Sequence, residues 1–411
     1  MDTAAQSAGV LSFEAACASV QQYLRQILDR PRQTEGVPLL QSLGRVLAEP
    51  VTADRDFPPF PRATRDGYAI RAEDLTPDQP RLLQVVGQVK AGDSYDLPLS
   101  SGEAVEIMTG AAVPQGADAV VMVEFTEANG DQVQIKRAVS AGENIVPAGA
   151  EARAGQELLA RGTRLGPAQI ALAAAAGAAR LELFAKPKVA ILSTGDELVD
   201  VGEKPGANQI RNSNSYSLAA LVLANGGEPV QLPIARDEEG RLTELVQEGL
   251  KADLLLLSGG VSMGKFDLVE IVLKKLGAEF FFTGATIQPG KPVVFGAVGE
   301  KPFFGLPGNP VSVMVTFDLF ARPLVEALGG AEPSRLKSAR ARLKKEFNTK
   351  TGLTRFLPAL LVGDLDDPQV EIVPWQGSGD MLAAARANCY LVVPPDRERL
   401  SEGEMVTIVQ R

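Results

Sequence analysis

The region from residue 188 to residue 328 alternates short apolar runs with segments of helical periodicity, and this pattern constrains the fold more than any other feature of the chain. The apolar runs are rich in β-branched residues and end in polar loops, which is typical of buried strands. Such alternation predicts a doubly wound, mostly parallel sheet with helices on both faces, which binds ligands beyond the carboxyl ends of its strands. The expected strands cover residues 188–193, 229–234, 253–257, 279–283, 292–296 and 302–305, and the expected helices lie near 214–225, 238–250, 266–276 and 310–328.

The segments on either side of this α/β region have other patterns. Short β-rich runs separated by Gly, Pro and Asp turns extend from about residue 82 to about residue 160, and again from 331 to 411. Residues 13–48 carry apolar residues at helical spacing, and another helix is expected over 167–176. A chain of this length has room for roughly two to four domains. We therefore expect an α/β multidomain protein with a helical and linker region (1–50 and 145–180), a β-rich N-terminal domain (51–144), a central α/β domain (181–330) and a small C-terminal β domain (331–411).

The composition favours a soluble globular protein that acts on small molecules. Of the 411 residues, 45% are hydrophobic and 22% are charged, and the formal net charge is −10. That charge disfavours nucleic acid and anionic membrane surfaces as partners, because phosphate neutralisation needs clustered Lys and Arg. The N-terminal stretch has no basic segment, and the alanine-rich run 168–179 is too short and too weakly hydrophobic to span a bilayer. We expect a cytoplasmic protein.

The chain contains no histidine, which limits the chemistry it can perform. Ser-His and Cys-His nucleophile systems, a histidine general base and imidazole metal sites are all excluded. The two cysteines, Cys17 and Cys389, have no paired spacing, so neither a disulfide framework nor a thiolate zinc site is expected. An active site in this chain must therefore use carboxylates, lysine, hydroxyls, backbone amides or a hard cation bound through oxygen.

Glycine-rich polar loops follow three of the expected strands. They read STGDEL (193–198), SGGVSMGKFD (258–267) and GLPGNPVS (305–312), and a related loop, QPGKP (288–292), precedes a strand. Backbone amides in such loops suit phosphate or carboxylate groups. Each loop taken alone could equally be a tight turn, but their shared position at one sheet edge favours a ligand site.

The loop 258–267 carries the fullest set of ligand-binding groups. Gly259 and Gly260 permit close approach of the backbone, and Ser262 adds a hydroxyl. Asp267 can face the same cavity, although an acidic residue at a helix start is often only matched to the helix dipole.

Acidic side chains in neighbouring loops predict a cation site. If Glu197 and Asp237 meet Asp267, the cluster either binds a divalent hard cation or raises one of its own pKa values. The alternative for Asp237 is a solvated turn residue before a helix. We expect the metal ligands to be Glu197, Asp237 and Asp267.

Seven motifs in order identify a resemblance that covers essentially the whole chain. They are DGYAI, IMTGAAVPQGADAVVMVE, ILSTGDEL, SGGVSMGKFD, QPGKPVVFG, FGLPGNPVS and GSGDMLAAARAN. In this combination the sequence resembles the molybdopterin molybdenumtransferases, the enzymes that insert molybdenum in molybdenum cofactor synthesis.

The resemblance implies a reaction, an assembly and a set of site residues. Members of the family take adenylated molybdopterin and molybdate, with Mg²⁺, and release AMP and the molybdenum cofactor. They are elongated homodimers, with possible transient contact with other proteins of molybdenum cofactor synthesis, and the DGYA and TGA loops of one subunit are expected to complete the cleft of the other. The catalytic residues implied are Asp66, Thr109, Glu197, Asp237 and Asp267, and the substrate-binding residues are Ser193, Gly259, Gly260, Ser262, Lys291, Pro307, Gly308, Asn309, Pro310 and Ser378.

The sequence also departs from the family pattern. Where relatives carry an arginine-rich motif with an aspartate, this chain reads VPAGAEA (146–152), so that Glu151 replaces the aspartate and the nearby arginine is absent. Arg62, Arg65 and Lys265 are the candidates to supply the displaced positive charge.

Two other functions remain open from the sequence. A pterin or nucleotide pyrophosphatase could use the same α/β domain, but it would leave the DGYA and TGA loops without a role. A non-catalytic scaffold of the gephyrin E-domain type would keep this fold and lack the reaction.

Overall fold

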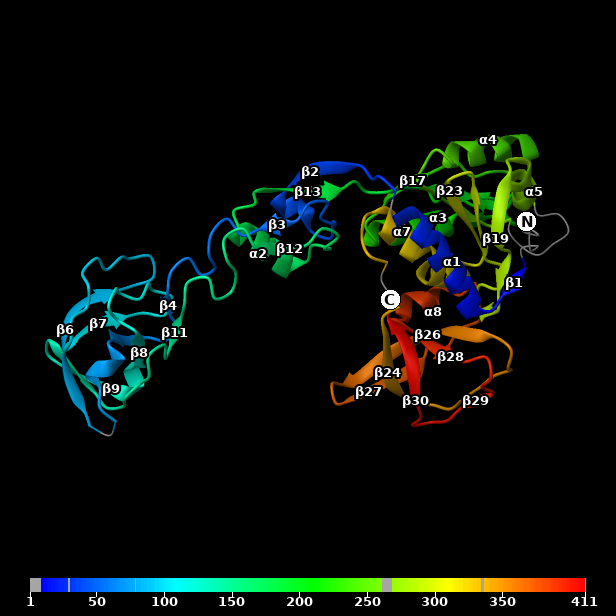
Figure 1. Cartoon of the computed structure of the whole chain (residues 1–411). Helices are drawn as coiled ribbons and strands as arrows, with labels where there is room; N and C mark the ends of the chain where they lie inside the picture. The colour runs from blue at the N-terminus through cyan, green and yellow to red at the C-terminus, as the bar shows by residue number, and fades with distance from the viewer. Residues whose placement is uncertain (1–8, 29, 78, 261–267, 334–335, 411) are drawn as a thin grey trace, which may run out of the picture.

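The computed structural model describes residues 9–28, 30–77, 79–260, 268–333 and 336–410. Figure 1 shows an elongated molecule, with a β-rich body at one end, a narrow connecting segment, and at the other end an α/β sheet beside a second β-rich body. No helix among the described residues is long and apolar enough to cross a membrane.

The central sheet confirms the predicted mostly parallel α/β fold. Its strand order is β17-β14-β18-β23-β22-β19. The first four strands are parallel, β22 is antiparallel to its neighbours on both sides, and β19 therefore runs in the same direction as the first four. The bounds are β14 (Lys188–Ser193), β17 (Glu228–Gln231), β18 (Leu254–Ser258), β19 (Ala278–Phe282), β22 (Val294–Val298) and β23 (Lys301–Leu306).

Alternating side chains on the central strands build two separate cores, one on each face of the sheet. Leu254 and Leu256 of β18 pack on one face, and Leu255 and Leu257 pack on the other, all almost fully buried. Removing a side chain such as Leu256 would cost about 2–5 kcal/mol of stability. The first core includes residues of α1 (Phe13–Leu28), α3 (Ser213–Ala224), α6 (Pro310–Thr316), the π-helical turn Phe317–Ala321 and α7 (Arg322–Leu328), and the second includes residues of α4 (Glu239–Gly249) and α5 (Leu268–Lys275).

The helical spacing expected over residues 13–48 continues only through α1. The helix ends at Leu28, and Thr34–Pro38 forms strand β2, which pairs antiparallel with β13 (Arg180–Phe184). Long-range pairing with β13 overrides the local apolar pattern there, as tertiary contacts commonly do. A short 3₁₀ helix, Leu39–Ser42, follows β2.

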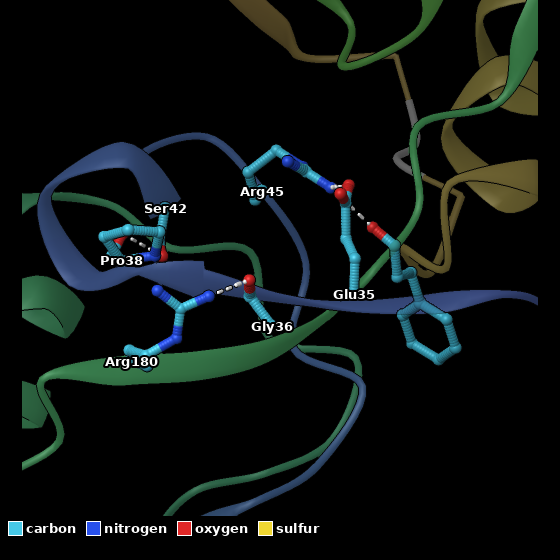
Figure 2. Close-up of polar contacts among 7 residues, drawn as sticks. Glu35, Gly36, Pro38, Ser42, Arg45 and Arg180 are labelled. Atoms are coloured by element: carbon cyan, nitrogen blue, oxygen red, sulfur yellow. Dashed lines mark hydrogen bonds and ion pairs between the residues drawn. The ribbon is translucent and has the colours of Figure 1, made fainter.

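The connecting segment has its own apolar core, and two arginine side chains add hydrogen bonds across it (Figure 2). Arg45 donates hydrogen bonds to the Glu35 carboxylate at 2.5 Å and to the carbonyl of Phe184 at 2.9 Å. Arg180 donates to the carbonyl of Gly36 at 2.5 Å across the β2–β13 pair. The segment also contains α2 (Pro167–Ala175) and the pair formed by β3 (Val51–Thr52) and β12 (Glu157–Leu159).

The β-rich body at the far end is a sheet with its own core. The strand order is β8-β5-β7-β6-β10-β9, and a short pair of β4 with β11 lies beside it. The strands are β4 (Arg62–Ala63), β5 (Gly67–Ile70), β6 (Arg81–Val89), β7 (Glu103–Ile107), β8 (Ala119–Met122), β9 (Thr126–Asn129), β10 (Gln132–Ile135) and β11 (Ile145–Val146).

The C-terminal β body is joined to the α/β part through a shared sheet. Strand β21 (Ile287–Gln288) follows β19 in the chain and pairs in parallel with β26 (Thr354–Asp364) of the C-terminal body. The remaining members are β24 (Ser338–Leu343), β27 (Asp367–Ile372), β28 (Cys389–Val393) and β30 (Met405–Gln410), with α8 (Met381–Arg386) beside them.

Candidate active site

A continuous cleft lies at the carboxyl ends of the parallel strands. It consists of pockets of about 760 Å³, 280 Å³ and 450 Å³. Gly259 and Gly308 line both the 760 Å³ and the 280 Å³ pockets, and Pro307 lines both the 280 Å³ and the 450 Å³ pockets. Their combined size suits an extended ligand rather than a single small ion.

The loop after β14 forms one wall of the cleft. Ser193, at the end of the strand, is buried and donates its hydroxyl to Oδ1 of Asn212 at 3.0 Å. Thr194 and Glu197 line both the 760 Å³ and the 280 Å³ pockets. Ser193 therefore holds the wall in place from behind.

The loop after β18 approaches this wall so closely that only glycine fits. Gly259 and Gly260 have φ values of 89° and 62°. A Cβ atom on Gly259 would lie 2.6 Å from the carbonyl oxygen of Thr194, and one on Gly260 would lie 2.7 Å from the Thr194 hydroxyl. The predicted site residues Ser262 and Asp267, together with Lys265, lie outside the described residues.

Carboxylates gather at the 280 Å³ pocket. Glu197 and Asp237 both line it, and the backbone amide of Asp237 donates to Oδ1 of Asp196 at 3.3 Å. Burial raises the pKa of Asp237, and the negative charges of Asp196 and Glu197 raise that pKa further. Within the described ranges, no group of three His, Cys, Asp or Glu side chains is arranged to hold a metal ion.

The loop after β23 connects the central sheet to the C-terminal body. Nδ2 of Asn309 donates to Oγ of Ser378 at 2.9 Å, and the backbone amide of Val311 donates to the carbonyl of Ser378 at 3.0 Å. Asn309 and Ser378 line the 450 Å³ pocket together with the exposed Lys291. Pro307 and Gly308 line the 280 Å³ pocket, and Pro310 lines the 760 Å³ pocket.

Asp66 and Thr109 do not join this cleft within one chain. Asp66 directly precedes β5 and Thr109 follows β7, both in the β-rich sheet at the opposite end of the molecule (Figure 1). The Asp66 carboxylate accepts bonds from the backbone amide of Thr109 at 2.6 Å and from its hydroxyl at 2.7 Å. These bonds lower the pKa of Asp66.

Arg62 supplies a positive charge beside Glu151. Its Nη2 lies 2.9 Å from Oε1 of Glu151, where β4 pairs with β11. Of the candidates for this charge, the ion pair involves Arg62, and no ion pair with Arg65 is found among the described residues.

The sequence did not single out two polar residues of the cleft wall. Asn214, in the first turn of α3, donates from Nδ2 to Oγ of Ser258 and to the carbonyl of Gly308. Thr194 is 4% exposed at the end of β14. Thr194 stands in the loop expected at 193–198, whereas Asn214 falls at the start of the helix expected near 214–225.

The C-terminal body also brings a buried arginine close to the cleft. Arg355 is 7% exposed and donates to the carbonyl of Leu353, which lines the 450 Å³ pocket. Burial lowers the pKa of its guanidinium. No sequence motif marked this position.

A mostly parallel α/β sheet with glycine loops, carboxylates and a lysine around a cleft at the carboxyl ends of its strands is typical of α/β proteins that bind a small-molecule ligand there. Three protein-family models match successive parts of the chain. They are the MoeA N-terminal region (domain I and II) over residues 11–177, the probable molybdopterin binding domain over 190–327, and the MoeA C-terminal region (domain IV) over 340–410. The chain belongs to the MoeA family of molybdopterin molybdenumtransferases.

Individual relatives agree over almost the full length. The chain is 36% identical over 397 residues to the molybdopterin molybdenumtransferase of Nostoc sp., which covers 93% of this chain and 90% of that protein. It is 35% identical to the enzyme of the same name from Bacillus subtilis, with 92% and 90% covered. The crystal structure of the molybdopterin biosynthesis MoeA protein from Pyrococcus horikoshii OT3 superposes with a TM-score of 0.81 at 30% identity, covering 98% of this chain and 100% of that one.

Proposed function

We propose that the cleft binds adenylated molybdopterin and molybdate, and that molybdenum insertion there releases AMP. As a molybdopterin molybdenumtransferase, the chain is a transferase of molybdenum cofactor biosynthesis that inserts molybdenum into molybdopterin. The observation that carries the finer proposal is the shape of the site, in which the 760 Å³, 280 Å³ and 450 Å³ pockets run continuously along one sheet edge. A dinucleotide-like substrate needs such a length.

Some groups along the cleft bind the substrate, and others neutralise its charge. Lys291 holds an anionic group in the 450 Å³ pocket, and the backbone at Gly259 and Gly260 permits a phosphate to approach closely. Catalysis then consists mainly of positioning and charge neutralisation, because phosphoanhydride cleavage by molybdate or a molybdate-activated water needs no protein nucleophile.

The carboxylate-lined middle of the cleft fits Mg²⁺. Mg²⁺ in proteins is usually bound by one or two carboxylates together with substrate phosphates and waters, and Glu197 and Asp237 line one pocket. Burial and the acidic neighbours raise the pKa of Asp237. A bound cation would stabilise the ionised carboxylate and lower that pKa. When bound, the ion would polarise the phosphoanhydride. Asp267 is proposed as a further ligand.

We also propose that the enzyme is a homodimer whose cleft is completed by the partner. Within one chain the sheet that carries Asp66 and Thr109 lies far from the cleft (Figure 1). In a symmetric dimer, the second copy would bring its own Asp66 and Thr109 to this cleft.

An assay with adenylated molybdopterin tests the proposal. We expect AMP release that depends on molybdate, stops in excess chelator and resumes with Mg²⁺. A pyrophosphatase would release AMP without molybdate, and a scaffold would release none, so either result would contradict the proposal.

A matched pair of lysine variants tests the binding role. Lys291→Ala should raise KM about tenfold to a hundredfold, because hydrogen bonds to charged groups are among the strongest. Lys301→Ala, at the end of β23 away from the cleft, removes a half-buried lysine near Asp253 and should leave turnover unchanged.

A further inference from the structure

The amide group of Asn214 is fixed in one orientation. Its Nδ2 lies 2.7 Å from the carbonyl oxygen of Gly308 and 2.9 Å from Oγ of Ser258. A carbonyl oxygen can only accept a hydrogen bond, so the nitrogen of the amide, and not its oxygen, must face Gly308. This assignment also fixes the direction of Oδ1.

Oδ1 of Asn214 is buried and accepts no hydrogen bond from any described part of the chain. The side chain lines the 760 Å³ pocket. Oγ1 of Thr194, a residue that is 4% exposed, is likewise buried without a partner among the described residues, and Thr194 lines the same pocket. Native proteins satisfy nearly all their buried polar atoms, so two such atoms on one pocket wall indicate ligand groups.

The chemistry of Oδ1 selects the kind of ligand group. An amide oxygen only accepts hydrogen bonds, so it disfavours phosphate or molybdate oxygens and favours an N–H donor. Apolar side chains also line this pocket, including Leu198, Val201 and Ile210, and they suit the faces of a flat ring. Lys291, which the proposed function assigns to an anionic group, lies in the 450 Å³ pocket and does not line this one.

We propose that Asn214 is a specificity-determining residue whose Oδ1 accepts a hydrogen bond from the amino group of the substrate's nitrogen heterocycle, with the Thr194 hydroxyl bonding the same ring. This inference rests on the proposed function, because adenylated molybdopterin carries two amino heterocycles, a pterin and an adenine. Both present the required N–H donor. The cleft is thereby divided into a ring-binding part and an anion-binding part.

Two pairs of probes distinguish the heterocycles. One pair is AMP and purine riboside 5′-monophosphate, which lacks the amino group, and the other is pterin and pteridin-4-one, which lacks it also. In the parent protein, the amino compound of one pair should bind about tenfold more tightly than its partner, since one hydrogen bond contributes about that factor. The pair that shows the preference identifies the ring.

Asn214→Ala should abolish that preference. The variant also loses the bonds to Ser258 and Gly308, so overall binding can fall, but only the loss of discrimination reports on Oδ1. Asn225→Ala, at the other end of α3, removes a bond from Asn225 to the carbonyl of Leu221 and should keep the preference. Thr194→Val replaces the hydroxyl with a methyl group and should weaken both compounds of the pair alike.

Several results would overturn the inference. The first is equal binding of the two compounds within both pairs by the parent protein, and this result decides the matter even if Asn214→Ala does not fold. The second is a preference for the amino compound that survives in Asn214→Ala. Turnover of adenylated molybdopterin by the parent protein is measured separately. If turnover depends on molybdate and the preference is absent, the specificity role of Asn214 fails while the proposed function stands.

Discussion

Thr109 donates both its backbone amide and its hydroxyl to one oxygen of the Asp66 carboxylate, at 2.6 Å and 2.7 Å. Asp66 comes just before β5 and Thr109 comes shortly after β7, 43 positions later. Because β5 and β7 are antiparallel neighbours, the two loops meet at the same end of the β-rich sheet. The bonds favour the ionised form of the carboxyl group, which explains why the pKa of Asp66 is lowered. Asp66 is therefore held as an oriented anion.

Removing the hydroxyl should raise the pKa of Asp66. The hydroxyl bond is the largest cause of the lowered pKa, so Thr109→Val should move that pKa back toward its ordinary value while the backbone bond remains. Carbon-13 NMR titration of the Asp66 carboxyl measures the change. Thr126→Val, whose hydroxyl bonds to the carbonyl of Val123, serves as the control and should leave the pKa unchanged. An unchanged value in Thr109→Val would show that the hydroxyl bond does not persist in solution.

The same bonds fix the sign of a pH effect on stability. A carboxyl whose pKa is lower in the folded protein stabilises it above the ordinary pKa, and this stabilisation is lost as the pH falls through the folded value. Thr109→Val should reduce that contribution at neutral pH and leave stability in strong acid unaffected. Because Asp66 is exposed, the effect should be small.

Mixed dimers should test whether Asp66 acts in the partner's cleft. Asp66→Ala and Glu197→Ala should each be inactive alone, but a mixed dimer would contain one site with both residues intact. Random mixing should recover up to about a quarter of the parental activity, because half of the dimers are mixed and each has one intact site. The measurement is AMP release after the two variants are mixed and re-equilibrated. Inactive mixtures that contain verified mixed dimers would place both residues in the same chain's site.

Asp237→Asn should stabilise the metal-free protein while reducing its activity. The pKa of Asp237 is raised, first by burial and then by Asp196 and Glu197, so ionisation of this group opposes folding. Its contribution is favourable below the ordinary pKa and is lost as the pH rises through the higher folded value. Thermal melts near neutral pH in chelator should therefore give a slightly higher Tm for Asp237→Asn than for the parent, and the gain should be small because Asp237 is largely exposed.

Glu238→Gln provides the matched control for this prediction. Glu238 is the neighbouring acidic residue, is exposed and does not line the cleft. Its substitution should leave both Tm and turnover near the parental values. If Asp237→Asn melts at the parental temperature, the carboxylates are better separated in solution than their positions suggest.

The sequence predicted the central sheet well because parallel strands buried on both faces carry continuous apolar runs. The run Asp253–Leu257 and the strand Leu254–Ser258 differ by one residue at each end. The region after α1 was predicted wrongly as helical, because the pairing of β2 with β13 depends on residues some 140 positions away. Local periodicity carries no information about such a partner.

The parts of the candidate site that could be predicted are those that the local sequence of a single loop indicates. Gly259 and Gly260 stand in a loop whose backbone must adopt positive φ, and glycine is the residue that permits it. Asn214 could not be predicted, because its significance depends on contact with Ser258 and with Gly308, which is 94 positions away. Its role follows from three segments meeting in space.

Ser378 should contribute to substrate binding without contributing much to the fold. Its hydroxyl accepts a bond from Asn309, while its carbonyl accepts a separate bond from the backbone amide of Val311. Ser378→Ala removes only the first bond, so the C-terminal loop should stay attached and the Tm should remain near that of the parent. The Asn309 side chain, freed in the wall of the 450 Å³ pocket, should then be less well positioned. We expect KM for adenylated molybdopterin to rise up to about tenfold, in line with the loss of one hydrogen bond, and kcat to change less. Ser401→Ala, in an exposed turn before β30, should alter neither parameter. Parental kinetics for Ser378→Ala would show that the Asn309 contact has no part in binding, and a large fall in Tm would instead make Ser378 a structural residue of the loop.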